Sequence, residues 1–268
     1  MWGMRIRDVD LAVEQTGRGP RMLWCHGLTS SMGRENERDL FGNMPEAIVA
    51  QGLELVRYDA RGHGRSGGTP DPEDYRWDNL AQDAKALHDE IAGNATEPWV
   101  VGGASMGAAT TLHLAVTHPH LVRAMVLVIP PTAWETRAAQ RQIYEKSAEF
   151  VQRNGTAAYV AASRALPPLP LFADQPDHGR FAPDISDELL PTVLRGAAGA
   201  NLPDPQSIAA IGAPTLILSW SQDPGHPVST GERLHELLPR STFQVADTLA
   251  HVKAWGATVA AFAAEQVR

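Results

Sequence analysis

Short apolar runs alternate with amphipathic stretches along most of this chain. The runs that predict buried β-strands each stop at a turn or a polar residue, and they cover 22–25, 53–58, 99–102, 125–129, 215–218 and 243–245. Between them, the spacing of apolar residues predicts helices over 45–51, 79–91, 106–117, 230–238 and 251–266. This alternation predicts an α/β fold with a mostly parallel, doubly wound sheet. Residues 5–16 alternate polar and apolar positions, which predicts an antiparallel strand at one edge.

One segment, residues 132–212, shows helical patterns and no strand signal. It is far longer than the roughly 2 to 6 residues that join a strand to a helix in an α/β fold. We therefore predict a core made of residues 1–131 and 213–268, with 132–212 inserted as a helical cap. The cap is expected over the carboxyl edge of the sheet, where open parallel sheets bind ligands.

Composition and charge narrow the class of protein. The chain has 268 residues, of which 43% are hydrophobic and 20% charged, as in soluble globular proteins. A formal charge of −8 argues against a nucleic-acid partner, because such proteins concentrate lysine and arginine. Cys25 is the only cysteine, which agrees with a reducing compartment. Neither a signal-peptide pattern nor an apolar run of membrane-spanning length is found, so we expect a cytoplasmic protein with no membrane partner.

The strongest chemical signal is the run 103–107, which reads G-A-S-M-G. It matches G-x-S-x-G and lies directly after a predicted strand and before a predicted helix, where this motif forms a sharp turn. Glycines at its first and last positions remove the Cβ atoms that would collide there. The pattern predicts that Ser105 is a nucleophile whose hydroxyl projects from the top of the sheet.

A serine nucleophile needs a base and an acid, expected in the chain order serine, acid, histidine. His251 follows the last predicted strand and is the only histidine after residue 235, so it is the predicted base. Asp223 lies in the loop after the strand 215–218 and is the predicted acid. Asp247 is only four residues from His251 in the same loop, which is a poor arrangement for holding the far ring nitrogen. Asp223 would fix the tautomer of His251 and stabilise its charged form.

The tetrahedral intermediate of acyl transfer also needs hydrogen-bond donors around its oxyanion. We expect these from the backbone N–H groups of Met106, which follows the nucleophile, and of Leu28, in the loop after the first parallel strand. For the substrate pocket we expect Trp220, Trp134 and His26, with His26 structural rather than catalytic.

The predicted cap is rich in aromatic residues, which suggests a small or medium apolar acyl or cyclic substrate. Its arginines Arg137, Arg141 and Arg164 would suit a substrate carboxylate, and solvated helix faces explain them equally well. The sequence of the cap does not distinguish these two interpretations. It does not predict the oligomeric state of the protein.

Taken together, these motifs resemble the α/β-hydrolase superfamily. The resemblance rests on His26-Gly27, the run 59–66 (D-A-R-G-H-G-R-S), the run 103–107, Asp223 with Pro227, and His251. It covers essentially the whole core, with the cap similar in position only. More narrowly, the chain is similar to the capped branch that holds 3-oxoadipate enol-lactonases, carboxylesterases and meta-cleavage C–C hydrolases. Two positions depart from the family pattern: Ala250 precedes His251, and Ser219-Trp220 replaces a glycine.

The resemblance implies a serine hydrolase that cleaves a small ester or lactone in two steps through an acyl-enzyme, with no cofactor and no metal. It also implies that Asp59, Arg61 and His63 brace a loop and take no part in catalysis. Ser105 argues against haloalkane dehalogenases and epoxide hydrolases, which need a carboxylate nucleophile. C–C bond hydrolases and cofactor-independent haloperoxidase-like enzymes keep a similar triad and stay open as alternatives. A ligand receptor on this fold is less favoured, because all three triad positions are present.

Overall fold

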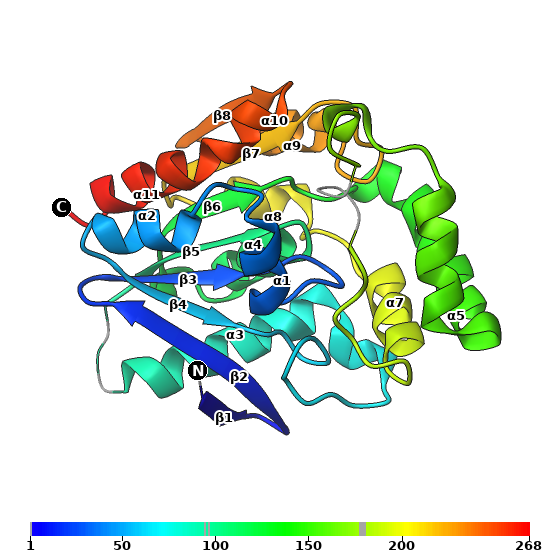
Figure 1. Cartoon of the computed structure of the whole chain (residues 1–268). Coiled ribbons are helices and arrows are strands. Elements are labelled where there is room, and N and C mark those ends of the chain that lie inside the picture. The colour runs from blue at the N-terminus through cyan, green and yellow to red at the C-terminus, as the bar shows by residue number, and fades with distance from the viewer. Residues whose placement is uncertain (1, 94, 96, 177–180) are drawn as a thin grey trace.

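The computed structural model describes residues 2–93, 95, 97–176 and 181–268. Its centre is an eight-stranded sheet (Figure 1). The strands are β1 (Trp2–Ile6), β2 (Val9–Gly17), β3 (Arg21–Cys25), β4 (Glu54–Tyr58), β5 (Trp99–Ala104), β6 (Val122–Val128), β7 (Thr215–Trp220) and β8 (Ser241–Ala246). They are ordered β1-β2-β4-β3-β5-β6-β7-β8. The predicted α/β class is confirmed, and the amino-terminal segment forms an antiparallel hairpin, with β1 at the edge of the sheet.

The direction of the strands decides where a site forms. β2 pairs with β4 antiparallel, whereas β4, β3, β5, β6, β7 and β8 are parallel to their neighbours. The carboxyl ends of these six strands therefore lie along one edge. The loops that follow β3, β5, β6 and β7 meet there, in the position where open parallel sheets bind ligands.

Helices cover both faces of the sheet. One face carries α3 (Trp77–Ala92), α4 (Met106–Thr117), α8 (Pro205–Ala209) and α9 (Val228–Leu237). The other carries α2 (Met44–Ala50) and α11 (Trp255–Glu265), which pack on each other. The spacing of apolar residues explains this packing. In α3, for example, Trp77, Leu80, Ala84 and Leu87 follow helical spacing and are all buried. Short helical turns η1 (Pro72–Tyr75) and η2 (Pro119–Leu121) and the five-residue α10 (Leu249–Lys253) complete the core.

Helices also fill the connection between β6 and β7. It contains η3 (Trp134–Thr136), α5 (Arg137–Ala165), η4 (Pro170–Phe172), α7 (Leu190–Gly199) and α8, while residues 177–180 lie outside the described part of the chain. α5 is interrupted at Gly155, which has φ 82° and ψ 163°. Figure 1 shows α5 and α7 side by side beyond the end of the sheet toward which the β3 arrow points.

The hydrophobic pattern did not predict the helix α1 (Met32–Arg38), which lies beside the site. It has only seven residues and buries Met32 alone, so it lacks the apolar stripe on which a sequence-based prediction depends. Its start is fixed by Ser31, whose hydroxyl accepts the N–H of Arg34 at 3.0 Å as a helix cap. Its end is fixed by Asp39, which adopts the left-handed conformation with φ 40°.

The loop after β4 is held by buried polar contacts, as the resemblance implies. One carboxylate oxygen of Asp59 accepts the N–H of Met32 at 2.8 Å, and the other accepts the N–H of Arg65 at 3.0 Å. Arg61 is fully buried and donates to both oxygens of Asp83 at 2.9 Å. Asp59 thereby ties the start of α1 to the core.

His63 in this loop gives a pH-dependent stability that can be measured. Burial, reinforced by the neighbouring His26, lowers the pKa of His63 to about 3. In the unfolded chain the imidazole takes up a proton near its ordinary pKa of about 6.5, so unfolding binds a proton between these two values. The stabilising contribution is therefore complete above about pH 6.5 and is lost as the pH falls toward 3.

We expect the free energy of unfolding to fall on going from about pH 7.5 to about pH 4.5, with roughly 2 to 3 kcal/mol of that fall due to His63. Urea denaturation of the wild type and of His63→Gln at both pH values measures this share. The glutamine does not titrate and keeps a donor for the Arg61 carbonyl, which Nδ1 of His63 contacts at 2.8 Å. If the free energy of unfolding falls equally in the wild type and in His63→Gln, protonation of His63 is not the cause of the fall.

Candidate active site

Ser105 occupies the turn between β5 and α4, as the G-x-S-x-G motif predicts. Its backbone has φ 53° and ψ −109°, a conformation that residues other than glycine rarely adopt. The N–H of Ser105 donates to the carbonyl of Val128 at 2.9 Å, which fixes the turn to the end of β6. Strained backbone of this kind is concentrated at functional sites, where the surrounding structure must hold it in place.

The two glycines of the motif are required by packing against β3. A Cβ atom on Gly107 would lie 1.9 Å from the carbonyl oxygen of Cys25, and one on Gly103 would lie 2.4 Å from the same oxygen. Neither gap admits a methyl group, and the obstacle is backbone that cannot rotate away. The spacing of the motif therefore reflects the close approach of the turn to the end of β3.

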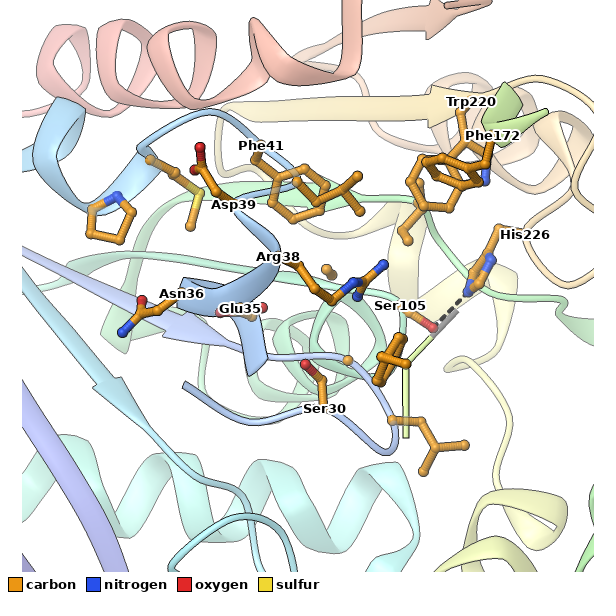
Figure 2. A pocket seen from close by; sticks show the side chains of 18 of the residues that line it. Ser30, Glu35, Asn36, Arg38, Asp39, Phe41, Ser105, Phe172, Trp220 and His226 are labelled. Carbon is orange, nitrogen blue, oxygen red and sulfur yellow. Dashed lines mark hydrogen bonds between the residues drawn. The ribbon is translucent and has the colours of Figure 1, made fainter. Parts of the chain in front are cut away.

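The histidine beside Ser105 is His226. Its Nε2 lies 2.8 Å from Oγ of Ser105, the contact drawn as a dashed line in Figure 2. Its Nδ1 lies 2.7 Å from a carboxylate oxygen of Asp223. An ionised carboxylate only accepts hydrogen bonds, so Nδ1 carries the proton and Nε2 is the nitrogen able to accept the Ser105 proton. Nucleophile, base and supporting acid are thus joined in one hydrogen-bonded chain.

His251, predicted from the sequence as the base, is not brought to Ser105. It is exposed on α10, and its own backbone N–H donates to the hydroxyl of Thr248 at 3.2 Å. α10 begins at Leu249 behind the Thr248 cap and buries Val252, which leaves His251 on the solvent side of the helix. This corrects the expected position of the base.

Asp223 lies where the sequence predicts it, in the loop after β7. Besides His226, the indole Nε1 of Trp220 donates to the same carboxylate oxygen at 2.8 Å, and the N–H of Gly225 donates to the other oxygen at 2.8 Å. Burial alone would raise the pKa of Asp223, but the bonds and charge from His226, the Trp220 bond and the Gly225 bond together lower it to about 2. The carboxylate is therefore ionised at neutral pH.

A tight turn explains how two residues only three apart meet. The N–H of His226 donates to the carbonyl of Asp223 at 3.2 Å, which brings both side chains to the same side of the loop. Pro227 follows directly as the cap of α9 and ends the turn. The sequence carried this signal as D-P-G-H-P, and His226 also satisfies the chain order serine, acid, histidine.

A cavity of about 570 Å³ opens at Ser105. This is a volume suited to a small molecule, since such sites usually measure about 300 to 1,000 Å³. Its walls come from the loop after β3, from α1 and α2, and from the connection between β6 and β7. The apolar part of the lining consists mainly of Phe41, Ile129, Leu169, Phe172, Phe181 and Trp220. Trp220, which the sequence analysis expects in the substrate pocket, is one of the residues that line this cavity.

The other two residues expected in the pocket lie elsewhere. His26 is buried, with Nε2 accepting the N–H of Ala60 at 2.9 Å and Nδ1 donating to the carbonyl of Gly27 at 2.8 Å, so it braces the loop after β3. Trp134 packs against the core and donates its indole N–H to the carbonyl of Pro203 at 3.0 Å. Neither lines the cavity at Ser105, which corrects their expected position in the pocket, and His26 has the structural place that was also expected of it.

The three arginines considered from the sequence of residues 132–212 do not line the cavity. Arg137 is buried and donates to the carbonyl of Ala200 at 2.8 Å, while Arg141 donates to the carbonyl of Ala198 at 3.0 Å. Arg164 is exposed. The cations that line the cavity are instead Arg38 on α1 and Arg57 on β4.

In the described part of the chain, no helix has the length and apolar character needed to cross a membrane. The same residues contain no group of three or more histidine, cysteine, aspartate or glutamate side chains arranged to hold a metal ion.

Known proteins similar to this chain fall in one family and share its fold. A family model described as alpha/beta hydrolase fold matches residues 20–257. Among curated proteins, the chain is 29% identical to 3-oxoadipate enol-lactonase 2 of Acinetobacter baylyi over 203 residues, which are 71% of this chain and 69% of that protein.

Solved structures extend the likeness to the whole fold. One is a thermophilic esterase from Thermogutta terrifontis with malate bound, with a TM-score of 0.77 and 21% identity over 100% of both chains. Another is an enol-lactonase from Burkholderia xenovorans LB400, with a TM-score of 0.76 and 18% identity over 97% of this chain and 98% of that one. At these identities the structures show a shared fold alone.

Proposed function

Because this chain belongs to the alpha/beta hydrolase family, we propose that it is a serine hydrolase that cleaves a small or medium carboxylic ester or lactone. The observation that carries the proposal is the hydrogen-bonded chain from Ser105 through His226 to Asp223, all three of which line the cavity. The likeness to an enol-lactonase at 29% identity supports the choice of an ester or lactone as the bond that is cleaved.

In the first step, Oγ of Ser105 attacks the substrate carbonyl carbon while Nε2 of His226 takes the hydroxyl proton. The resulting imidazolium lies 2.7 Å from the Asp223 carboxylate, which stabilises its positive charge. The tetrahedral intermediate then expels the alkoxide, and His226 returns the proton to this leaving group. In the second step, His226 activates a water molecule that hydrolyses the acyl-enzyme and releases the acid.

The oxyanion formed in both steps needs donors close to Oγ. We propose the backbone N–H groups of Met106, at the start of α4, and of Leu28. Leu28 lines the cavity, and a Cβ on its neighbour Gly27 would lie 3.7 Å from Cβ of Ser105. The loop after β3 therefore passes directly beside the nucleophile, which supports this assignment.

We further propose that residues 132–212 act as a cap on a core made of residues 1–131 and 213–268. Leu169, Phe172 and Phe181 from this segment line the cavity together with core residues. Phe172 also packs edge-on against Trp220, with ring centroids 5.4 Å apart. The segment would thus shape the pocket for the acyl or alcohol part of the substrate.

The proposal can be tested by measuring the hydrolysis of p-nitrophenyl esters from acetate to decanoate. No metal is added to the assay. We expect turnover by the wild type, with the highest kcat/KM for short to medium acyl chains because of the limited cavity, and loss of turnover in Ser105→Ala. Equal turnover in Ser105→Ala would exclude Ser105 as the nucleophile. If the wild type neither hydrolyses any ester nor is labelled by a fluorophosphonate, the serine hydrolase proposal fails.

A further inference from the structure

One aromatic side chain belongs both to the wall of the cavity and to the contacts of the triad. Trp220 is the last residue of β7, at a position where the sequence departs from the family pattern. It is 4% exposed and lines the cavity. Its indole Nε1 donates at 2.8 Å to the same oxygen of Asp223 that faces Nδ1 of His226. The indole is therefore a pocket wall and a direct partner of the supporting acid.

Neighbouring rings fix the direction in which the indole N–H points. The Trp220 ring stacks on Trp255, with ring centroids 6.2 Å apart and an angle of 13° between the planes. Phe172 packs edge-on against Trp220 at 5.4 Å, and the imidazole of His226 does so at 6.1 Å. Figure 2 shows Phe172 and Trp220 together at the end of the pocket where His226 lies. An indole packed in this way has little freedom to rotate, so its N–H is held toward Asp223.

Phe172 comes from residues 132–212, the segment that we propose as the cap. It ends the short helical turn η4 and is 2% exposed. It belongs to the same buried cluster as Trp220 and Trp255, on the face of the sheet that carries α2 and α11. Within the described part of residues 132–212, it is the only buried member of this cluster. The place that the cap gives to Phe172 therefore determines how Trp220 is packed.

We propose that Trp220 is a positioning residue that links the cap to the triad. Phe172 holds the indole, and the indole N–H holds the Asp223 carboxylate in the orientation that His226 needs. This inference rests on the proposed function, because it concerns the triad of the same site. Its consequence is that kcat depends on Phe172, a residue whose ring contact is with Trp220 and not with the triad.

The contacts of Asp223 show why the indole bond matters. The other carboxylate oxygen accepts the N–H of Gly225 at 2.8 Å, so Trp220 and Gly225 hold opposite ends of the group. Gly225 lies in the same turn as Asp223 and His226, whereas Trp220 is part of β7 and is paired with β8. The indole bond is thus the one that ties the carboxylate to the sheet rather than to its own turn.

Acyl chain length separates positioning of the triad from shaping of the wall. We would measure kcat and KM on p-nitrophenyl acetate, butanoate and octanoate. Trp220→Phe keeps an aromatic ring and removes the N–H, so kcat should fall about tenfold, and by a similar factor on all three esters. A residue that only shaped the wall would instead change KM, and would do so most for the longest chain.

Phe172→Leu tests the link to the cap. It leaves a smaller cavity than Phe172→Ala would, so the protein is expected to fold. We expect kcat to fall about three- to tenfold on all three esters, whereas KM is free to change because Phe172 lines the cavity. In the Trp220→Phe background, adding Phe172→Leu should lower kcat by no more than about a further twofold, because the bond through which it acts is already absent.

Phe41→Leu is the matched control for both variants. Phe41 lines the same cavity, and its ring contacts are with Trp24 and Trp255. The substitution changes the wall without removing a neighbour of the indole N–H. It should therefore alter KM and leave kcat close to the wild-type value.

The proton between Nδ1 of His226 and Asp223 gives a readout that needs no turnover. Its ¹H NMR signal is assigned by its loss in His226→Ala, and its chemical shift depends on the geometry of this hydrogen bond. We expect the signal to move in Trp220→Phe and in Phe172→Leu, and to stay in place in Phe41→Leu.

Three results would overturn the inference. They are an unmoved signal in both Trp220→Phe and Phe172→Leu, an effect of these variants on KM alone, and losses of kcat that multiply fully in the double variant. Failure of the proposed function looks different, because the signal would then move as expected while the wild type hydrolyses no ester.

Discussion

Replacing His226 with alanine is expected to lower kcat/KM for a p-nitrophenyl ester by about 10⁴-fold or more, to the level of Ser105→Ala. His226 holds the only imidazole that the described residues place in hydrogen-bond contact with Oγ of Ser105, at 2.8 Å. Without it the hydroxyl has no base to accept its proton, and the leaving group has no acid. Steady-state rates on the best ester of the chain-length series measure the loss.

His251→Ala is the matched control for this prediction. His251 is exposed on α10, so its removal should leave kcat/KM and the melting temperature close to the wild-type values. Both variants must retain the wild-type melting transition for the rates to be compared. A large loss of activity in His251→Ala, with His226→Ala still active, would show that the pairing of His226 with Ser105 does not operate in catalysis.

Asp223→Asn should lower kcat by about 10³- to 10⁴-fold. An asparagine amide can present its NH₂ group to Nδ1, which favours the wrong tautomer, and it carries no charge to stabilise the imidazolium. Since the pKa of Asp223 is lowered to about 2, the wild-type carboxylate stays ionised throughout the neutral range, and the substitution removes this charge at every pH at which the enzyme is assayed.

Two further substitutions give rates with which the rate of Asp223→Asn can be compared. Trp220→Phe removes one of the donors to Asp223 while keeping an aromatic ring in the wall, so we expect a smaller fall in kcat, about tenfold. Asp247→Asn changes the other aspartate considered from the sequence, which is exposed after β8, and should have no effect. An Asp223→Asn protein as active as Asp247→Asn would contradict the role of Asp223.

The parallel sheet and the Ser105 turn could be predicted because local patterns determine them. Buried strands read as short apolar runs, and the turn needs glycines at two fixed positions beside β3. The helix α1 could not be predicted in this way, because it buries a single apolar residue and is held by a cap at Ser31 and a contact to Asp59. The contact to Asp59 joins residues that are 27 positions apart in the sequence.

The choice of histidine failed for a related reason. Both His226 and His251 satisfy the order serine, acid, histidine, so the order does not distinguish them. A separation of four residues within one loop argues against Asp247 as the partner of His251, yet Asp223 and His226 are only three residues apart. A turn at Asp223 orients this pair, and the phase of α10 turns His251 to solvent. Turn geometry and helix phase at single-residue precision are not readable from composition and spacing.

The cations that line the cavity could not be predicted from the sequence either. The arginines of residues 132–212 left two interpretations open, binding of a substrate carboxylate or exposure on solvated helix faces. Arg137 and Arg141 in fact donate to backbone carbonyls at the end of α7 and just after it. The arginines that line the cavity, Arg38 and Arg57, lie on α1 and β4.

Activation of Ser105 by His226 can be tested without any substrate. The test is the rate at which a fluorophosphonate labels the protein. Intact mass followed by peptide mapping gives both the rate and the labelled residue. We predict that the fluorophosphonate labels Ser105 at the same rate in the wild type and in His251→Ala. In His226→Ala, labelling of Ser105 should be slower by orders of magnitude. Rapid labelling of Ser105 in His226→Ala, with slow labelling in His251→Ala, would contradict it.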